Sequence, residues 1–138
     1  MWFSLAALVL VALAGPALAQ NASFKADLKG AEEVPPVNTQ GTGSVTATYD
    51  AAGKRLTWTG TVSGLSGPAT AAHFHGPAER GKNAGVMVPV QGAASGKFEG
   101  SATLTDDQAR ALTSEQMYFN VHTAANPGGE LRGQVTKQ

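Results

Sequence analysis

The sequence predicts an all-β protein: a single antiparallel Greek-key or immunoglobulin-like β-sandwich, or a flattened barrel, with one short helix. Three observations favour this fold class. Short stretches alternate polar with apolar residues, seventeen glycines are spread over 138 residues, and a single segment has a helical pattern. Alternation with a period of two places successive side chains on opposite faces of a strand. We expect about seven or eight strands around one core, in one domain.

The N-terminal segment is typical of an export signal. An apolar run over residues 5–13 leads to the small-x-small motif Ala-Leu-Ala, which ends at Ala19. The run is too short to span a membrane and fits a secretory signal peptide. We therefore interpret residues 1–19 as a signal peptide and residues 20–138 as the mature β domain. We expect that domain to be periplasmic or secreted and not attached to a membrane.

Composition narrows the classes of partner and chemistry. Ten Lys and Arg residues balance ten Asp and Glu residues without a run of like charges, so nucleic acid and anionic membrane surfaces are not expected partners. The chain has no cysteine. This excludes disulfides, thiolate catalysis, zinc–thiolate sites and iron–sulfur clusters.

The N-terminal half predicts three strands and one irregular segment. Residues 24–28 alternate and form the first strand, whereas the two adjacent prolines in residues 32–37 favour an extended edge or loop. Residues 42–49 and 55–62 alternate on either side of a turn, which predicts a hairpin. Trp58 lies on the apolar face of this hairpin and is expected to be buried.

The middle of the chain combines a strand with a polar loop. A strand that contains residues 71–75 ends at a Gly-Pro pair, and residues 78–85 form a polar loop beside it. In residues 86–90, the three valines share one face and Met87 lies on the opposite face. Met87 is therefore expected to point away from the core.

The C-terminal third predicts three strands and the helix. Residues 96–104, 117–123 and 129–135 alternate as strands, and residues 106–112 form the helix. Thr105 precedes this helix and is followed three residues later by a glutamine, which is a capping-box pattern.

Three histidines are the only ones in the chain, and the strand pattern places them on one face. His73 and His75 are two residues apart in a strand, so both imidazoles point the same way. His122 lies in a second strand, on the face opposite its apolar residues. The polar face of the three neighbouring segments carries His73, His75, His122, Tyr118, Asn120, Glu130 and Arg132.

Neutral imidazole is the commonest protein metal ligand, so His73, His75 and His122 are candidate ligands. Nitrogen ligands without thiolate suit copper or zinc, and the order of divalent affinities favours copper. Met87 as a soft fourth ligand would favour Cu(I) over Cu(II). Glu130 could bind the metal, orient a histidine, or pair with Arg132.

Four segments resemble the CHRD domain, named for chordin and common in exported bacterial proteins. They are GAEEVPPV at residues 30–37, AHFHGPA at 72–78, YFNVHT at 118–123 and NPGGELRGQ at 126–134. The resemblance extends over residues 24–135. It implies a secreted all-β module and does not imply a reaction.

Three functions fit these observations. The first is an exported copper protein for metal storage, delivery or tolerance. The second is an extracytoplasmic interaction module that binds another exported protein through residues 32–37 or 78–85, with structural histidines. The third is a mononuclear copper enzyme acting on superoxide or a similar small oxidant. The sequence has no Gly-x-Ser-x-Gly motif, identifies no catalytic residue, and favours a carrier over an enzyme.

Overall fold

The computed structural model describes Val11 and residues 21–138. Apart from Val11, the predicted signal peptide and its cleavage site lie outside the described residues. The described chain forms nine antiparallel strands in a nearly closed barrel with one short α-helix, which confirms the all-β fold class. None of its helices is long and apolar enough to cross a membrane.

The elements follow the alternating pattern of the sequence. In order they are β1 (Ala22–Lys29), the 3-10 turn η1 (Gly30–Glu32), β2 (Thr42–Asp50), β3 (Arg55–Ser63), β4 (Ala69–His75), β5 (Val86–Val90), the 3-10 turn η2 (Ala93–Ser95), β6 (Lys97–Thr103), α1 (Asp106–Thr113), β7 (Tyr118–Thr123), β8 (Leu131–Gln134) and β9 (Thr136–Lys137). The last predicted strand, residues 129–135, corresponds to β8, and the short strand β9 follows it and pairs with β1.

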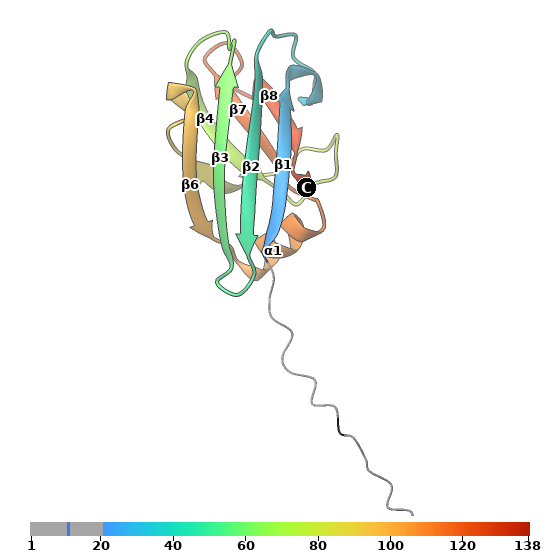
Figure 1. The fold of residues 1–138 in the computed structure, drawn as a ribbon. Helices are drawn as coiled ribbons and strands as arrows, with labels where there is room; N and C mark the ends of the chain where they lie inside the picture. The colour runs from blue at the N-terminus through green and yellow to red at the C-terminus, as the bar shows by residue number, and fades with distance from the viewer. Residues whose placement is uncertain (1–10, 12–20) are drawn as a thin grey trace, which may run out of the picture.

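The sheet brings together strands that are far apart in the sequence. Its order is β5-β4-β7-β8-β1-β2-β3-β6. Figure 1 shows β6, β3, β2 and β1 on the near side of the barrel, with β4, β7 and β8 behind them. Among the described strands, no ladder joins β5 to β6, so the barrel is open along that seam. The histidine strands β4 and β7 are direct neighbours.

Aromatic side chains fill the barrel between the two walls. Phe74 of β4 contacts Trp58 of β3 and Phe119 of β7, with ring centroids 5.3 Å and 4.9 Å away. Trp58 is buried as predicted. Met117 is also completely buried in this core. Because Phe74 and Phe119 point inward, the residues that alternate with them point outward.

A bulge in β5 changes the expected orientation of two side chains. Phe74 pairs with Val88 but His75 pairs with Val86, so Met87 is an extra residue between these pairs. Val86 is 53% exposed, whereas Met87 packs against the core. The prediction that Met87 lies opposite a face of three valines is therefore wrong, because simple alternation does not anticipate a bulge.

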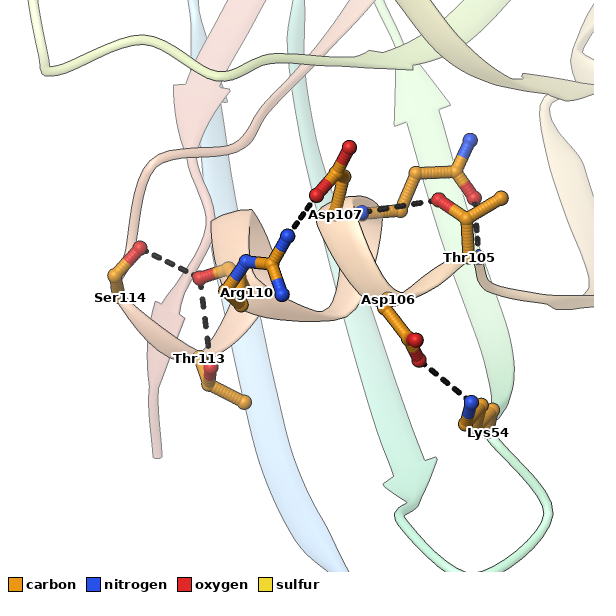
Figure 2. Close-up of polar contacts among 8 residues, drawn as sticks. Lys54, Thr105, Asp106, Asp107, Arg110, Thr113 and Ser114 are labelled. Atoms are coloured by element: carbon orange, nitrogen blue, oxygen red, sulfur yellow. Dashed lines mark hydrogen bonds and ion pairs between the residues drawn. The ribbon is translucent and has the colours of Figure 1, made fainter.

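The helix α1 begins with the predicted capping box. The Thr105 hydroxyl accepts a hydrogen bond from the Gln108 backbone N–H, and the Gln108 side chain accepts one from the Thr105 N–H (Figure 2). Lys54, from the β2–β3 turn, pairs with Asp106 in the first turn of the helix. Leu112 is fully buried, so the helix packs its apolar side against the barrel.

Candidate metal centre

The three histidines meet on the outer face of the wall formed by β4, β7 and β8. His73 pairs with Asn120 across β4 and β7, and Asn120 pairs in turn with Arg132 across β7 and β8. His122 follows Asn120 by two residues on the same strand, so it shares this face. The structure therefore brings together the three predicted ligands, from two adjacent strands.

The distances among the three rings fit a metal ion. One nitrogen from each of His73, His75 and His122 lies within 4.8 Å of the others, and these residues form a group that could hold a metal. His73 Nδ1 is 3.1 Å from His122 Nε2. Two nitrogens bound at ~2.0–2.1 Å to one tetrahedral metal would be about 3.3 Å apart. A small adjustment of the rings would therefore suffice for coordination.

Backbone carbonyls fix the tautomers of two of the rings. His75 Nδ1 is 3.0 Å from the Ala84 carbonyl oxygen, and His122 Nδ1 is 2.9 Å from the Pro127 carbonyl oxygen. A carbonyl oxygen only accepts, so in the neutral rings both Nδ1 atoms carry the proton and both Nε2 atoms keep a lone pair. In the metal-free protein, His73 Nδ1–H then donates to His122 Nε2.

The environment keeps His73 and His75 uncharged near neutral pH. Burial lowers the pKa of His73, and the neighbouring His122 and His75 lower it further. Burial also lowers the pKa of His75, against the opposing effect of its hydrogen bond to Ala84. A neutral imidazole is the form that binds metal, so these shifts favour binding.

Comparison with known protein families identifies the domain. The CHRD domain matches residues 24–135 of the chain. This protein belongs to the CHRD domain family. A search of curated proteins found no match. Residues 30–37, 72–78, 118–123 and 126–134, in which the sequence resembles the CHRD domain, all contribute side chains or backbone atoms to this outer face.

In this CHRD domain, Tyr118 connects the histidines to the loop of residues 78–85. Its ring stacks on His75, with centroids 4.8 Å apart and an interplanar angle of 2°. Its hydroxyl donates to the Ala84 carbonyl oxygen and accepts from the Ala84 N–H, at 2.9 and 3.0 Å. The same carbonyl holds His75, so Tyr118 and His75 fix the loop at a shared atom.

Arg132 lies on the other side of Tyr118. Its guanidinium carbon is 3.5 Å from the Tyr118 ring centroid, which is a cation–π contact. It donates to Asn83 Oδ1 at 2.7 Å and to the Lys82 carbonyl oxygen, and the residue is only 2% exposed. Arg132 and Glu130 have separate partners, so the ion pair considered between them is not among those of the described residues.

Glu130 is not part of the three-histidine group, and its side chain lies in a junction of loops. Its carboxylate is fully buried. It accepts hydrogen bonds from Thr39, Ser66, Thr123 and Asn126. Burial alone would raise the pKa of Glu130, but the hydrogen bonds from Ser66, Thr123 and Thr39 lower it to about 2. The structure thus places Glu130 where it joins three connections of the barrel.

The Met87 side chain lies near the histidine strand but against the core. Its sulfur would be 3.2 Å from a Cβ atom on Gly76, the residue after His75. Its backbone carbonyl accepts a hydrogen bond from Gln108 at 3.1 Å. The side chain is partly buried against the core, and ligation by Met87 stays a prediction from the sequence.

Two further residues of the outer face were given no role by the sequence patterns. Glu33, in the loop after η1, is 5% exposed, and Asn120 is 4% exposed. Glu33 Oε2 and Asn120 Oδ1 have no hydrogen-bond partner among the described residues. Burial raises the pKa of Glu33 to about 7, against the lowering effects of Arg132 and Asn120. Two features of the sequence pointed to these residues. Glu33 lies in the GAEEVPPV segment that resembles the CHRD domain, and the alternation of residues 117–123 places Asn120 on the same face as His122.

Gly129 allows Glu33 to reach this position. Its φ is +125°, and a Cβ atom there would be 1.8 Å from Glu33 Oε2 and 2.7 Å from Asn120 Nδ2. Any larger residue would overlap the carboxyl group and adopt a strained backbone. Glu33, Asn120 and the β7–β8 turn therefore pack around one point next to the histidines.

Proposed function

We propose that this CHRD domain is an exported copper carrier that holds one ion through His73, His75 and His122, for storage, delivery or tolerance. The observation that carries the proposal is the convergence of three imidazole nitrogens within 4.8 Å. Copper is favoured over zinc by the order of divalent affinities, and zinc suits the same donors. Export to the periplasm or outside the cell rests on the predicted signal peptide.

The surroundings of Arg132 favour a carrier over an enzyme. A copper enzyme for superoxide needs an open position at the metal and a positive group that is free to attract the anion. The guanidinium of Arg132 already binds Asn83 and Lys82 and lies over Tyr118. It is nearly inaccessible to solvent, so it is poorly placed to attract a substrate.

The two segments considered for protein binding lie over the same face. The Asn83 side chain donates to the Val34 carbonyl oxygen at 3.3 Å, and Arg80 pairs with Glu32 at 3.0 Å. These contacts join residues 32–37 to residues 78–85. An exported partner that binds either segment would therefore contact the two loops next to the proposed metal site. Such contact fits the delivery of metal from one protein to another.

Metal titration of the purified protein tests the proposal. We expect about one equivalent of copper per chain, measured by competition with a chelator of known affinity. Replacing His73, His75 or His122 by alanine should weaken binding by at least about a hundredfold. Glu99→Ala, on the exposed side of β6, is the matched control and should bind as the wild type does. Unchanged stoichiometry and affinity in the triple alanine variant would overturn the proposal.

The pH dependence of binding provides a second measurement. Because the pKa values of His73 and His75 are lowered, protons should compete with the metal only at acidic pH. Affinity should change little between pH 8 and 7 (roughly, from the ordinary histidine pKa) and fall as the pH drops below about 6. An affinity that is independent of pH down to about 5 would argue against imidazole ligands.

Superoxide turnover separates the carrier from the enzyme. The copper-loaded protein should remove superoxide no faster than an equal amount of a simple copper–peptide complex. Faster turnover that is lost in Arg132→Ala, with copper still bound, would support the enzyme instead. Copper content is measured in the same samples, so that loss of metal is not mistaken for loss of activity.

A further inference from the structure

Asn120 lies beside the histidine cluster, on the same face of the sheet. It pairs with His73 across the strands and precedes His122 by two residues on the same face of β7. His75 follows His73 by two residues in β4, so its ring lies on the same face, beside Asn120. The amide is thus adjacent to all three proposed ligands, although no pattern in the sequence distinguished it from the other polar residues of this face.

Unsatisfied polar atoms are concentrated at this point. The described residues have four buried side-chain nitrogen or oxygen atoms without a hydrogen-bond partner, and three of them are Glu33 Oε2, His75 Nε2 and Asn120 Oδ1. Leaving a buried polar atom unpaired costs about 1–3 kcal/mol, so such a group of atoms indicates a missing partner. A cation would satisfy two of these atoms, the ring nitrogen and the amide oxygen, at once.

Glu33 lies next to the nitrogen end of the Asn120 amide. Glu33 Oε2 and Asn120 Nδ2 both lie next to the point that a Cβ atom on Gly129 would occupy. With Nδ2 next to Glu33, the carbonyl oxygen Oδ1 lies on the opposite side of the amide group.

We infer that Asn120 Oδ1, oriented by Glu33, is a fourth ligand of the metal site and makes the site select divalent ions over Cu(I). This inference rests on the proposed function. An amide oxygen is a hard donor that suits Zn(II) or Cu(II), whereas Cu(I) prefers sulfur donors and is satisfied by fewer ligands. Three imidazoles alone would bind both Cu(I) and Cu(II). The additional amide oxygen strengthens the binding of the divalent ion relative to Cu(I). Asn120 is the ligand and Glu33 is a positioning residue.

The ratio of affinities for Zn(II) and Cu(I) tests this inference. In Asn120→Leu, Zn(II) affinity should fall by about tenfold to a hundredfold while Cu(I) affinity changes by less than about threefold. Glu33→Leu should shift the ratio in the same direction by a smaller factor. Glu33→Gln should keep the wild-type ratio, because a glutamine carbonyl oxygen can take the place of Glu33 Oε2 beside Asn120 Nδ2. Asn38→Leu, which replaces an exposed amide, is the matched control and should leave the ratio unchanged.

Spectra of the Co(II)-substituted protein give a measurement that does not depend on affinity. Loss of an oxygen ligand changes the energy and intensity of the visible cobalt bands, whereas a distant structural change does not. If Asn120→Leu fails to fold, Asn120→Asp keeps an oxygen at the same place and should keep or increase Zn(II) affinity. Equal losses for both metals, or an unchanged ratio and cobalt spectrum, would overturn the inference. Either result would leave the three-histidine site intact, because that proposal is tested by the histidine variants.

Discussion

Two buried carboxyl groups, Glu130 and Glu33, adjoin the β7–β8 turn and have opposite surroundings. The Glu130 carboxylate accepts hydrogen bonds from four residues, and its pKa is lowered to about 2. Glu33 Oε2 has no partner among the described residues, and the pKa of Glu33 is raised to about 7. Burial is nearly complete for both. The supply of donors, rather than burial, therefore distinguishes a carboxylate that stabilises the fold from one that is available to a site.

The largest effect is expected at Glu130. Replacing it by alanine would remove the carboxylate that accepts hydrogen bonds from the side chains of Thr39, Ser66, Thr123 and Asn126 inside the junction of loops. We expect a loss of about 3–5 kcal/mol in the free energy of unfolding, measured by urea denaturation of the metal-free protein. A loss below about 1 kcal/mol would show that the hydrogen bonds of Glu130 contribute little to stability. Glu130 and Glu33 would then not differ in their contribution to the fold.

A smaller loss is expected at Gly129, where an added methyl group would overlap the Glu33 carboxyl group. Gly129→Ala should destabilise the protein by about 2 kcal/mol, through the overlap and the positive φ. Combining it with Glu33→Ala should recover part of that loss, since the overlap disappears. A double-mutant cycle measures this coupling. Strict additivity would mean that the two residues do not contact each other.

The two carboxyl groups should also give opposite slopes of stability against pH. The folded-state pKa of Glu33 is raised, so stability should fall as the pH rises from about 4.5 to about 7. That of Glu130 is lowered, so its contribution is present above about 4.5 and is lost as the pH falls toward about 2. We expect that the fall in stability between about pH 4.5 and about 7 is smaller by about 1–2 kcal/mol in Glu33→Gln, allowing for solvent screening. Urea denaturation at several pH values, applied to the wild type, Glu33→Gln and Glu130→Gln, gives the free energy of unfolding against pH. A contribution of Glu33 that rises with pH, or one of Glu130 that falls with pH, would contradict the prediction.

The smallest effect is expected at the helix cap, which is far from both carboxyl groups. Thr105→Ala removes the acceptor for the Gln108 N–H and should cost about 1 kcal/mol (Figure 2). Thermal denaturation would measure it. Metal affinity and the pH slopes should stay as in the wild type. A change in metal affinity would mean that stability itself alters binding, and each variant above would then need the same correction.

Much of the fold could be predicted because its strands follow a regular alternation. Trp58 is buried as expected, and the capping box starts α1. The orientation of Val86 and Met87 was wrong because a bulge adds one residue to β5, and no local pattern marks it. The short strand β9, which lies beyond the last predicted strand, was also not expected.

The meeting of the histidines was predictable for the same reason, since alternation placed them on the face opposite Phe74 and Phe119. Loops were harder. Glu33 reaches the site from a loop whose path depends on Gly129, almost a hundred residues later. The partners of Arg132 also lie in a loop, so the alternative of pairing with Glu130 could not be excluded from strand positions. Contacts made by loops depend on backbone paths that periodicity does not encode.

The β7–β8 turn has a consequence for transplanting the site. Its Pro127 carbonyl oxygen sets the tautomer of His122, and its Asn126 side chain is held by Glu130. A designer who copied only the three histidines onto another antiparallel wall would transfer the ligands without the groups that orient them. The smallest unit that could be transferred is therefore the hairpin of residues 118–134 together with β4 and the loop of residues 78–85. The loop is needed because the Ala84 carbonyl oxygen sets the tautomer of His75, as the Pro127 carbonyl oxygen sets that of His122.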